Sequence, residues 1–510
     1  MSISIGKFTL ESLTTGMYNE PETCFREYIQ NAVDSLDQAI EKGIISEKES
    51  RIEIIVNDEQ CVISIKDNGT GIKSSLARRV LLDIGNSTKL HTVNRGFRGI
   101  GRLGGLSYCK RLNFCTSAQG EDVKTIITFD CEYLKKLLVP GQEEESTLQE
   151  VIEAVTTVET HEEQEAEHYF IVKMENVDDI STLLDLNFVK DYISQVAPIP
   201  FKKNFYWSSQ IKEEMNAKDF SIAEYPVFIG RSFESLSQVY KPYKLTFDIS
   251  ARAGASKDEI YGISFFDVTD IHGGVLAYGW YADTDFSGTL ADTRLSGIRI
   301  RLGNILIGTA KTLSPYFKEP RFNGWVVGEV YVVSQNLIPN ARRDDFERND
   351  TFNSFEKGIR ETVGSVVSDK IRAASKARNN PAEKKIKKAE KTISNTKRLL
   401  TDGFNSTFEK EQTIDSISSM IKELQTIPKS NAPEVVQKKA LLMESLSSLE
   451  DDVSGSSNYR TQKDITSDFS KAQRKIVRAM LEVLTRNFER ETVDSLYKEF
   501  LIELKMKGKR

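Results

Sequence analysis

The stretch from Phe25 to Ser35 constrains this chain more than any other, because it reads as a helix with polar chemistry on one side. Glu27, Asn31 and Asp34 are spaced i, i+4 and i+7, so their side chains project from one helical face. The other faces carry apolar residues, at Phe25, Ile29, Ala32, Val33 and Leu36. We therefore expect a largely buried helix, in which a carboxylate or carboxamide is costly unless a partner pairs with it. For this segment alone, a helix whose polar side faces water is the alternative.

A predicted β-hairpin at residues 51–66 leads into an acidic turn. Apolar and polar residues alternate on both sides of a polar turn at 57–60, which is typical of two short strands. The second strand runs straight into Asp67, Gly69 and Gly71. Such a carboxylate can accept a hydrogen bond from the exocyclic amine of a purine, while glycines let a flat ring approach the backbone. An ordinary Asp-x-Gly turn is the alternative.

A glycine-rich segment at residues 95–106 cannot be the interior of a helix, because residues 96–105 contain five glycines. It suits a loop that enters a helix N-terminus, where free N–H groups and the helix dipole favour an anion such as phosphate. Positive charge surrounds it at Lys89, Arg95, Arg98 and Arg102, for each of which a solvated loop face is an equal alternative. The chain has no Gly-Lys-Ser or Gly-Lys-Thr sequence of the P-loop type.

In this order the motifs resemble the Bergerat (GHKL) ATP-binding fold of Hsp90, DNA gyrase B, MutL and the histidine kinases. The acid–Asn–Asp helix is similar to the N-box of the Hsp90, MutL and MORC branch. Histidine kinases lack the acid found here at Glu27, so the resemblance implies hydrolysis of ATP rather than phosphotransfer to a histidine. The expected fold class is α+β, with a Bergerat α/β sandwich as the ATP-binding domain at residues 1–177.

The resemblance implies a role for each matching residue. Glu27 would orient and deprotonate the attacking water, and Asn31 would hold a Mg²⁺ ion that bridges the phosphates of ATP. Asp34 matches the second acid of that helix, and Asp67 would recognise the adenine amine. The remaining matches surround the nucleotide, with Gly69 and Gly71 beside the ring and Ser87, Thr88, Lys89, Gly96, Gly99, Ile100 and Gly101 in a lid over the phosphates.

One position departs from the family. Relatives place a threonine ahead of a late strand near the adenine, whereas the matching strand at 170–174 follows His168 and Tyr169. That contact is therefore missing or comes from elsewhere. Residues 140–168 are expected to form an acidic, helical and mobile insertion. A metal site at His161 and His168 is the alternative to solvated surface histidines, which are the favoured interpretation.

A second α+β domain is expected at residues 178–352, and the resemblance implies a transducer domain of the S5-like type. Short apolar strands and turns dominate this region. Arg299 and Arg301 alternate with apolar residues between 298 and 302, which predicts a half-exposed strand.

The end of the second domain, residues 324–347, resembles the Hsp90 middle-domain segment that ends in a catalytic-loop arginine. The resemblance implies that Arg342 or Arg343 reaches the γ-phosphate when the domains close. A forked, always-charged donor suits the charge that grows on the transferring phosphoryl group. A surface arginine that caps a helix beside Asp344 and Asp345 is an equal alternative.

Residues 353–510 are expected to form a charged helical region. Long charged helices with a narrow apolar stripe favour a coiled coil or a helical arm. Three helices are expected at residues 414–424, 435–449 and 468–507. Contact of the basic run at 384–391 with nucleic acid is the alternative to a solvated helix face, which is favoured. The apolar stripe from Ala472 to Leu504 is typical of a dimerisation or docking helix.

Composition and charge narrow the classes of function. With 510 residues the chain is too long for a single core, and its net charge of -6 gives no whole-chain reason to expect nucleic acid. Five scattered cysteines indicate reduced thiols rather than a zinc site. We expect neither a signal peptide nor a membrane span, and hence a soluble cytoplasmic protein without a membrane partner.

The sequence therefore predicts an Hsp90-like, Mg²⁺-dependent ATPase. Binding of Mg-ATP is expected to close the lid and bring the arginine of the second domain to the phosphate, a closure that relatives couple to N-terminal dimerisation. The expected partners are a second copy of the chain and a protein client or effector. The alternatives are a MORC- or MutL-like clamp on DNA, serving a nuclease or defence partner, and a nucleotide-gated scaffold without turnover.

Overall fold

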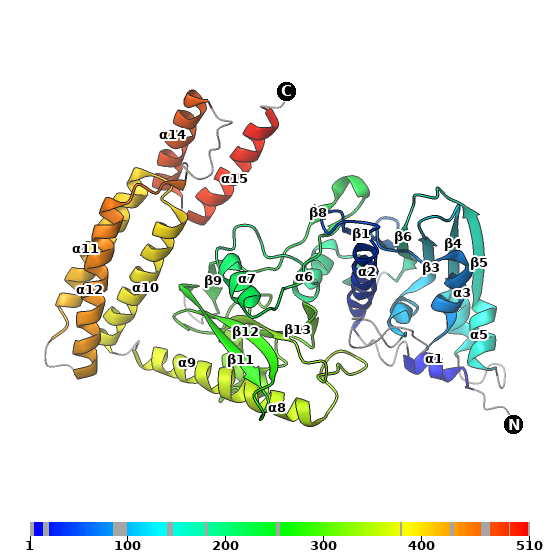
Figure 1. Ribbon diagram of the computed structural model, residues 1–510. Coiled ribbons are helices and arrows are strands. Elements are labelled where there is room, and N and C mark those ends of the chain that lie inside the picture. Colours follow the sequence, from blue (N-terminus) through cyan, green and yellow to red (C-terminus); the bar gives the residue numbers. More distant parts are fainter. Residues whose placement is uncertain are drawn as a thin grey trace.

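Three bodies lie in a row in the computed structural model: a first body that contains the N-terminus, a second around a smaller sheet, and a helical arm (Figure 1). The residues that the structure describes are 5–13, 20–84, 99–139, 146–178, 182–250, 256–377, 380–428, 433–460, 470–488 and 490–507. In that part of the chain, no helix combines the length and apolar character that crossing a membrane requires.

The first body is built on an eight-stranded mixed sheet with the strand order β5-β4-β3-β6-β2-β1-β7-β8. Its strands are β1 (Ile52–Asn57), β2 (Val62–Asp67), β3 (Cys109–Ser117), β4 (Val123–Asp130), β5 (Thr156–Glu162), β6 (Tyr169–Val177), β7 (Val227–Gly230) and β8 (Ser237–Gln238). The predicted hairpin is confirmed as β1 and β2, and the predicted late strand is confirmed as β6, which lies between β2 and β3. β7 pairs in parallel with β1, so the sheet also takes up residues beyond 177.

Helix α2 (Thr23–Glu41) supplies one side of the core of the first body. Its residues Phe25, Ile29, Val33 and Leu36 are at most 1% exposed, which confirms the predicted buried helix. The other helices of this body are α1 (Phe8–Leu13), α3 (Ser74–Leu82), α4 (Cys131–Leu137), α5 (Leu148–Val155) and α6 (Leu186–Val196), with the 3₁₀ turns η1 (Gly101–Gly105) and η2 (Thr182–Leu184).

The predicted acidic insertion is helical only in part. Helix α5 begins with a capping box made by Thr147 and Glu150. The following β5 is an edge strand of the sheet and pairs with β4, so the expectation of a wholly helical insertion is wrong. Threonine and valine dominate the first residues of β5, and β-branched side chains favour a strand over a helix.

The second body has a five-stranded sheet with cores on both faces. The sheet has the order β11-β12-β15-β13-β14, and a separate two-stranded ribbon pairs β10 with β9. The strands are β9 (Thr246–Ile249), β10 (Ser256–Glu259), β11 (Gly262–Thr269), β12 (Val275–Asp283), β13 (Gly297–Leu302), β14 (Ile305–Ile307) and β15 (Val327–Val332). On β15, Val330 and Val332 belong to the core with α8 and α9, whereas Val327 and Tyr331 belong to the core with α7.

The helices of the second body cover its two faces. They are α7 (Ser208–Ala217), α8 (Asp350–Ile359) and α9 (Val366–Ala377), with the short turns η4 (Ser314–Tyr316) and η5 (Pro320–Trp325) and a π-helical turn, η6 (Arg360–Ser365). The short turn η3 (Phe233–Ser235) belongs to the first body, where it connects β7 and β8. Helices α8 and α9 follow each other along the sheet, as Figure 1 shows.

Strand β13 is buried on both faces, so the predicted half-exposed strand is wrong. Arg299 and Arg301 are 1% and 0% exposed. The chain around Gln195 covers their face of the sheet, because the Gln195 carbonyl accepts a 3.0 Å hydrogen bond from Arg301 Nη2. Lys241 is also buried in this region. An alternating pattern is therefore present, but the polar side faces a second core rather than water.

The arm is a three-helix bundle followed by a helical hairpin. The helices are α10 (Pro381–Asp402), α11 (Thr407–Gln425), α12 (Pro433–Gly455), α14 (Lys471–Asn487) and α15 (Arg490–Lys507). The first three share a core that includes Ile386, Ile417 and Leu446. The single helix predicted at 468–507 is wrong, since α14 ends at an extended Phe488.

The basic run of the arm lies against the second body and α11. Lys391 Nζ lies 3.3 Å from a Glu259 oxygen, and Lys388 Nζ lies 2.5 Å from a Glu423 oxygen. These ion pairs hold α10 in place, which agrees better with a structural role than with a free nucleic-acid surface.

Candidate functional site

The polar face of α2 lies at the centre of the candidate site. Glu27 and Asp34 are 8% and 2% exposed, and Asn31 is half-buried. The backbone of Gly101 covers Glu27 so closely that a Cβ there would lie 2.1 Å from Glu27 Oε2. The predicted face is therefore buried, and a glycine-rich turn rather than bulk water covers its acid.

Residues 101–105 form the 3₁₀ turn η1, which is fixed on α2. The Tyr28 hydroxyl accepts a 2.8 Å hydrogen bond from Gly105 N and donates a 3.2 Å bond to the Arg102 carbonyl. Arg102 Nε in turn donates to the Leu81 carbonyl at 3.0 Å. Burial lowers the pKa of Arg102 to about 10. The end of the glycine-rich segment is thus anchored between α2 and the C-terminus of α3.

Only part of the predicted lid can be placed. Gly99 has a φ of 70°, a left-handed backbone that favours glycine, and Ile100 is 8% exposed beside Gly101. The other predicted members, Ser87, Thr88, Lys89 and Gly96, lie outside the described residues.

The acidic turn at residues 67–71 has a backbone that requires its two glycines. Asp67 ends β2, is 3% exposed, and accepts a 2.9 Å hydrogen bond from Gly69 N. A Cβ on Gly69 would lie 2.1 Å from Ser35 Oγ on α2. Gly71 has a φ of 61°, and a Cβ there would lie 1.8 Å from the Ser117 carbonyl. Glycine is thus the residue that lets this turn lie against α2 and β3 together.

Two residues that the sequence did not assign to the site hold the far end of this turn. The Thr116 hydroxyl accepts a 2.8 Å bond from Ile72 N and donates a 3.1 Å bond to the Tyr169 carbonyl. His168 Nδ1 lies 2.8 Å from the Gly69 carbonyl and must be the donor, because a carbonyl only accepts. Thr116 is therefore a threonine at the end where the family contact was expected, supplied from β3.

The two candidate arginines of the second body differ in their surroundings. Arg343 is 6% exposed, and its Nε lies 3.8 Å from Glu27 Oε1. Its φ is 55°, and its carbonyl accepts a 2.8 Å bond from Gly308 N, which holds this tight turn. Arg342 is exposed, and its carbonyl accepts a 2.8 Å bond from Arg26 Nη2. It is Arg343 whose side chain reaches the acid of α2.

Helix α2 carries a second polar stripe that was not predicted from the sequence. This stripe faces segments that come much later in the chain. Arg26, Gln30 and Asp37 are spaced i, i+4 and i+11, which puts them on one side of the helix. Arg26 contacts the loop of Arg342, and Asp37 accepts a hydrogen bond from the Tyr225 hydroxyl. The spacing of these three polar residues at i, i+4 and i+11 is the sequence feature from which the second stripe could have been predicted.

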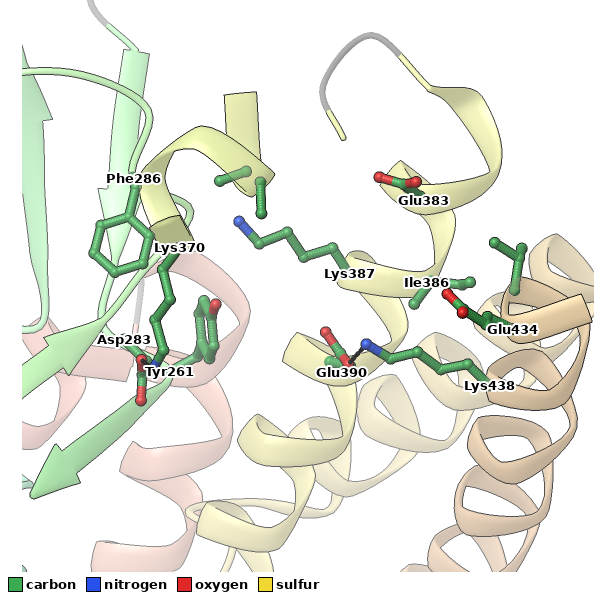
Figure 2. Close-up of a pocket in the computed structure, with 13 residues that line it drawn as sticks. Tyr261, Asp283, Phe286, Lys370, Glu383, Ile386, Lys387, Glu390, Glu434 and Lys438 are labelled. Carbon is green, nitrogen blue, oxygen red and sulfur yellow. Dashed lines mark hydrogen bonds and ion pairs between the residues drawn. The ribbon is translucent and has the colours of Figure 1, made fainter. Parts of the chain in front are cut away.

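A cavity of about 610 Å³ lies elsewhere, between the second body and the arm. Its walls come from β12, α9, α10 and α12, and Figure 2 shows an ion pair between Lys438 and Glu390 on one side. Acids and lysines both line it, and its lining contains none of the predicted site residues. The cavity is a seam between two bodies and not part of the site on α2.

The donor set on α2 fits a hard cation. The amide oxygen of Asn31 is the type of ligand that Mg²⁺ accepts when substrate oxygens and waters complete its shell. Within the described ranges, no cluster of three or more histidine, cysteine, aspartate or glutamate side chains could hold a metal by itself.

Comparison with known proteins agrees with this geometry. Residues 18–169 match the family model described as histidine kinase-, DNA gyrase B-, and HSP90-like ATPase. The matched range begins just before α2, contains the acidic turn and η1, and ends at the first residue of β6. No curated protein matches the chain. The match supports a GHKL-type ATP-binding domain in the first body, and with it ATPase activity.

Proposed function

We propose that the chain hydrolyses ATP to ADP and phosphate in the first body, with the second body contributing a cation to the reaction. The contact between Arg343 Nε and Glu27 Oε1, at 3.8 Å, carries this proposal. It joins the acid of the ATPase-like domain to an arginine from a different body. Two buried residues so far apart in sequence and so different in charge suit a reaction centre shared by both bodies.

Glu27 is the proposed general base. Its carboxylate lies on the polar face of α2 and is covered by Gly101, and as the base it would hold the attacking water and accept its proton. Phosphoryl transfer needs little covalent help, mainly a positioned nucleophile and stabilisation of charge. Mg²⁺, held at Asn31, would supply positive charge that offsets the negative charge of the phosphate.

The remaining residues bind and orient the nucleotide. Asn31 would hold the metal, and Asp67 would accept a hydrogen bond from the adenine amine. Asp67 is buried at the end of β2, and its Oδ1 accepts a hydrogen bond from Gly69 N, which fixes the carboxylate in the turn. Arg343 would leave Glu27 and turn to the γ-phosphate oxygens, where its fork matches the growing charge.

We further propose that the cycle is of the Hsp90-like type, with lid closure and dimerisation coupled to remodelling of a client. The contact of the loop of Arg342 and Arg343 with α2 supports this proposal, because it links the nucleotide face to the second body. A DNA clamp is the second candidate, and α14 favours it by exposing Lys471, Arg474 and Arg478. Duplex DNA that stimulates ATP turnover in a salt-dependent way would favour the clamp.

Substitution of Glu27 tests the catalytic proposal. Glu27→Ala should abolish ATP turnover by the full chain while leaving ATP binding intact, as measured by phosphate release and equilibrium binding. Glu41→Ala, an exposed glutamate at the end of the same helix, is the matched control and should turn over normally. Normal turnover by Glu27→Ala would remove Glu27 from the mechanism.

A further inference from the structure

Gln30 is a buried amide without a hydrogen-bond partner in the part of the chain that the structure describes. It is 0% exposed, and among the described residues neither its Oε1 nor its Nε2 has a hydrogen-bond partner. Burying a polar group without a hydrogen bond lowers the stability of this arrangement, and a group that pairs in a second arrangement can offset that cost through function. Gln30 lies on the second polar stripe of α2, which runs beside the face of Glu27, Asn31 and Asp34.

The neighbour of Gln30 on this stripe is also only partly satisfied. Arg26 lies one helical turn earlier, and its Nε has no hydrogen-bond partner among the described residues. Its Nη2 donates to the Arg342 carbonyl at 2.8 Å, while its Nε lies 3.9 Å from Glu27 Oε1. A donor and an acceptor without partners are therefore one turn apart.

Catalysis as proposed above requires the loop of Arg343 to move. When Arg343 turns toward phosphate, the adjoining Arg342 carbonyl moves with it, and Arg26 loses the acceptor of its Nη2. The guanidinium would then stay beside Glu27 and compete for the oxygen that must accept a proton from water. Gln30 Oε1, on the residue one helical turn from Arg26, is an acceptor without a partner among the described residues and could hold Arg26 away from Glu27.

We propose that Gln30 is a positioning residue that accepts a hydrogen bond from Arg26 when the loop of Arg342 and Arg343 leaves α2, an inference that rests on the proposed ATPase function. The orphaned amide is then not a packing defect. It lacks a partner in the arrangement described here and has one in the arrangement that hydrolyses ATP. Gln30 acts through Arg26 and touches neither nucleotide nor water.

Gln30→Met tests this role, because methionine has a similar length and shape but cannot accept the hydrogen bond. We expect turnover to fall roughly tenfold, the size of one hydrogen bond to a charged group, with KM for ATP unchanged. The thermal midpoint of the full chain should rise by roughly 1–4 °C, because an unsatisfied buried group is removed. Gln30→Glu restores an acceptor for Arg26 and should recover turnover.

Gln149→Met is the control, since Gln149 is an exposed glutamine on a different helix, α5, and it should leave turnover unchanged. A Gln30→Met protein that melts lower, or fails to fold, overturns the proposal, because the amide would then already be satisfied. Unchanged turnover in Gln30→Met, with a parent that hydrolyses ATP and a dead Glu27→Ala, overturns the positioning role alone. A parent without turnover overturns the proposed function and the role of Gln30 with it.

Discussion

Two buried glutamates are each approached by two cations within the part of the chain that the structure describes, and their surroundings differ sharply. Glu329, at 0% exposure, lies 2.6 Å from Lys241 Nζ and also bonds to Arg301 Nε. The Tyr243 hydroxyl donates to it at 2.9 Å. Glu27 lies 3.8 and 3.9 Å from the Nε atoms of its two arginines, which exceeds hydrogen-bond distance.

This difference in distance distinguishes the carboxylate of Glu329, which has a structural role, from that of Glu27, which can exchange its partners. Burial alone would raise the pKa of Glu329, but Arg301 and Lys241 hold it at about 2. Its donors are buried side chains, of which Arg301 lies on β13 and Lys241 and Tyr243 lie in the segment between β8 and β9. The cations at Glu27 come from α2 and from a loop of the second body, and a small rearrangement can replace either one. A buried carboxylate that is fully hydrogen-bonded to its cations thus has a structural role. A buried carboxylate whose cations lie beyond hydrogen-bond distance, one of them in another body, is a candidate for a reactive site.

The largest expected effect is on stability, from Glu329→Gln. This change leaves Lys241 and Arg301 buried without a counter-charge, so the free energy of unfolding should fall by about 3–5 kcal/mol. The measurement is urea denaturation of the full chain, followed by tryptophan fluorescence. Glu27→Gln is the matched change at the other glutamate and should alter stability by less than about 1 kcal/mol. Equal losses in the two variants would erase the distinction between the sites.

The next effect is on turnover, from Arg343→Gln. We expect ATP hydrolysis to fall about 100-fold with the fold intact, because the proposed stabilising charge on the phosphate is lost. Arg342→Gln should change turnover by less than about threefold, since Arg342 contributes its carbonyl to Arg26 and every residue has a carbonyl. Steady-state phosphate release measures both variants. A larger loss in Arg342→Gln would exchange the roles of the two arginines.

The sequence predicted the parts of the site that lie within one element. The face of Glu27, Asn31 and Asp34 follows from helical spacing, and the hairpin that ends in Asp67 follows from strand alternation. Thr116 escaped prediction because its neighbours in the site come from other strands of the sheet. Such a site is assembled by strand order, which a local pattern does not contain.

The sequence did not predict which polar side chains are buried by segments that lie far away in the chain. The period-two pattern at Arg299 and Arg301 correctly indicated a strand, but alternation does not reveal whether water or a second core lies beyond the polar side. The stripe containing Arg26 and Gln30 had the same ambiguity. Its meaning depends on the loop at Arg342, more than three hundred residues later in the chain.

The smallest expected effect concerns pH and the cluster around Glu329. Burial, and next the charge of Arg301, lowers the pKa of Lys241 to about 7 from its ordinary value of 10.5. Above pH 7 the unfolded chain therefore binds more protons at this residue than the folded chain, so stability rises with pH. The contribution is about 1 kcal/mol between pH 7 and 8.

Lys241→Met removes this titration, so the pH slope of its unfolding free energy should be shallower than that of the parent by that amount. The slope is the diagnostic quantity, because loss of a partner for Glu329 also lowers stability by an amount that does not vary in this pH range. Urea denaturation at pH 7.0, 7.5 and 8.0 measures it in both proteins. Parallel slopes would mean that Lys241 keeps its proton throughout, as a fully compensated ion pair does, and the contrast with the loosely held Glu27 would then be greater still.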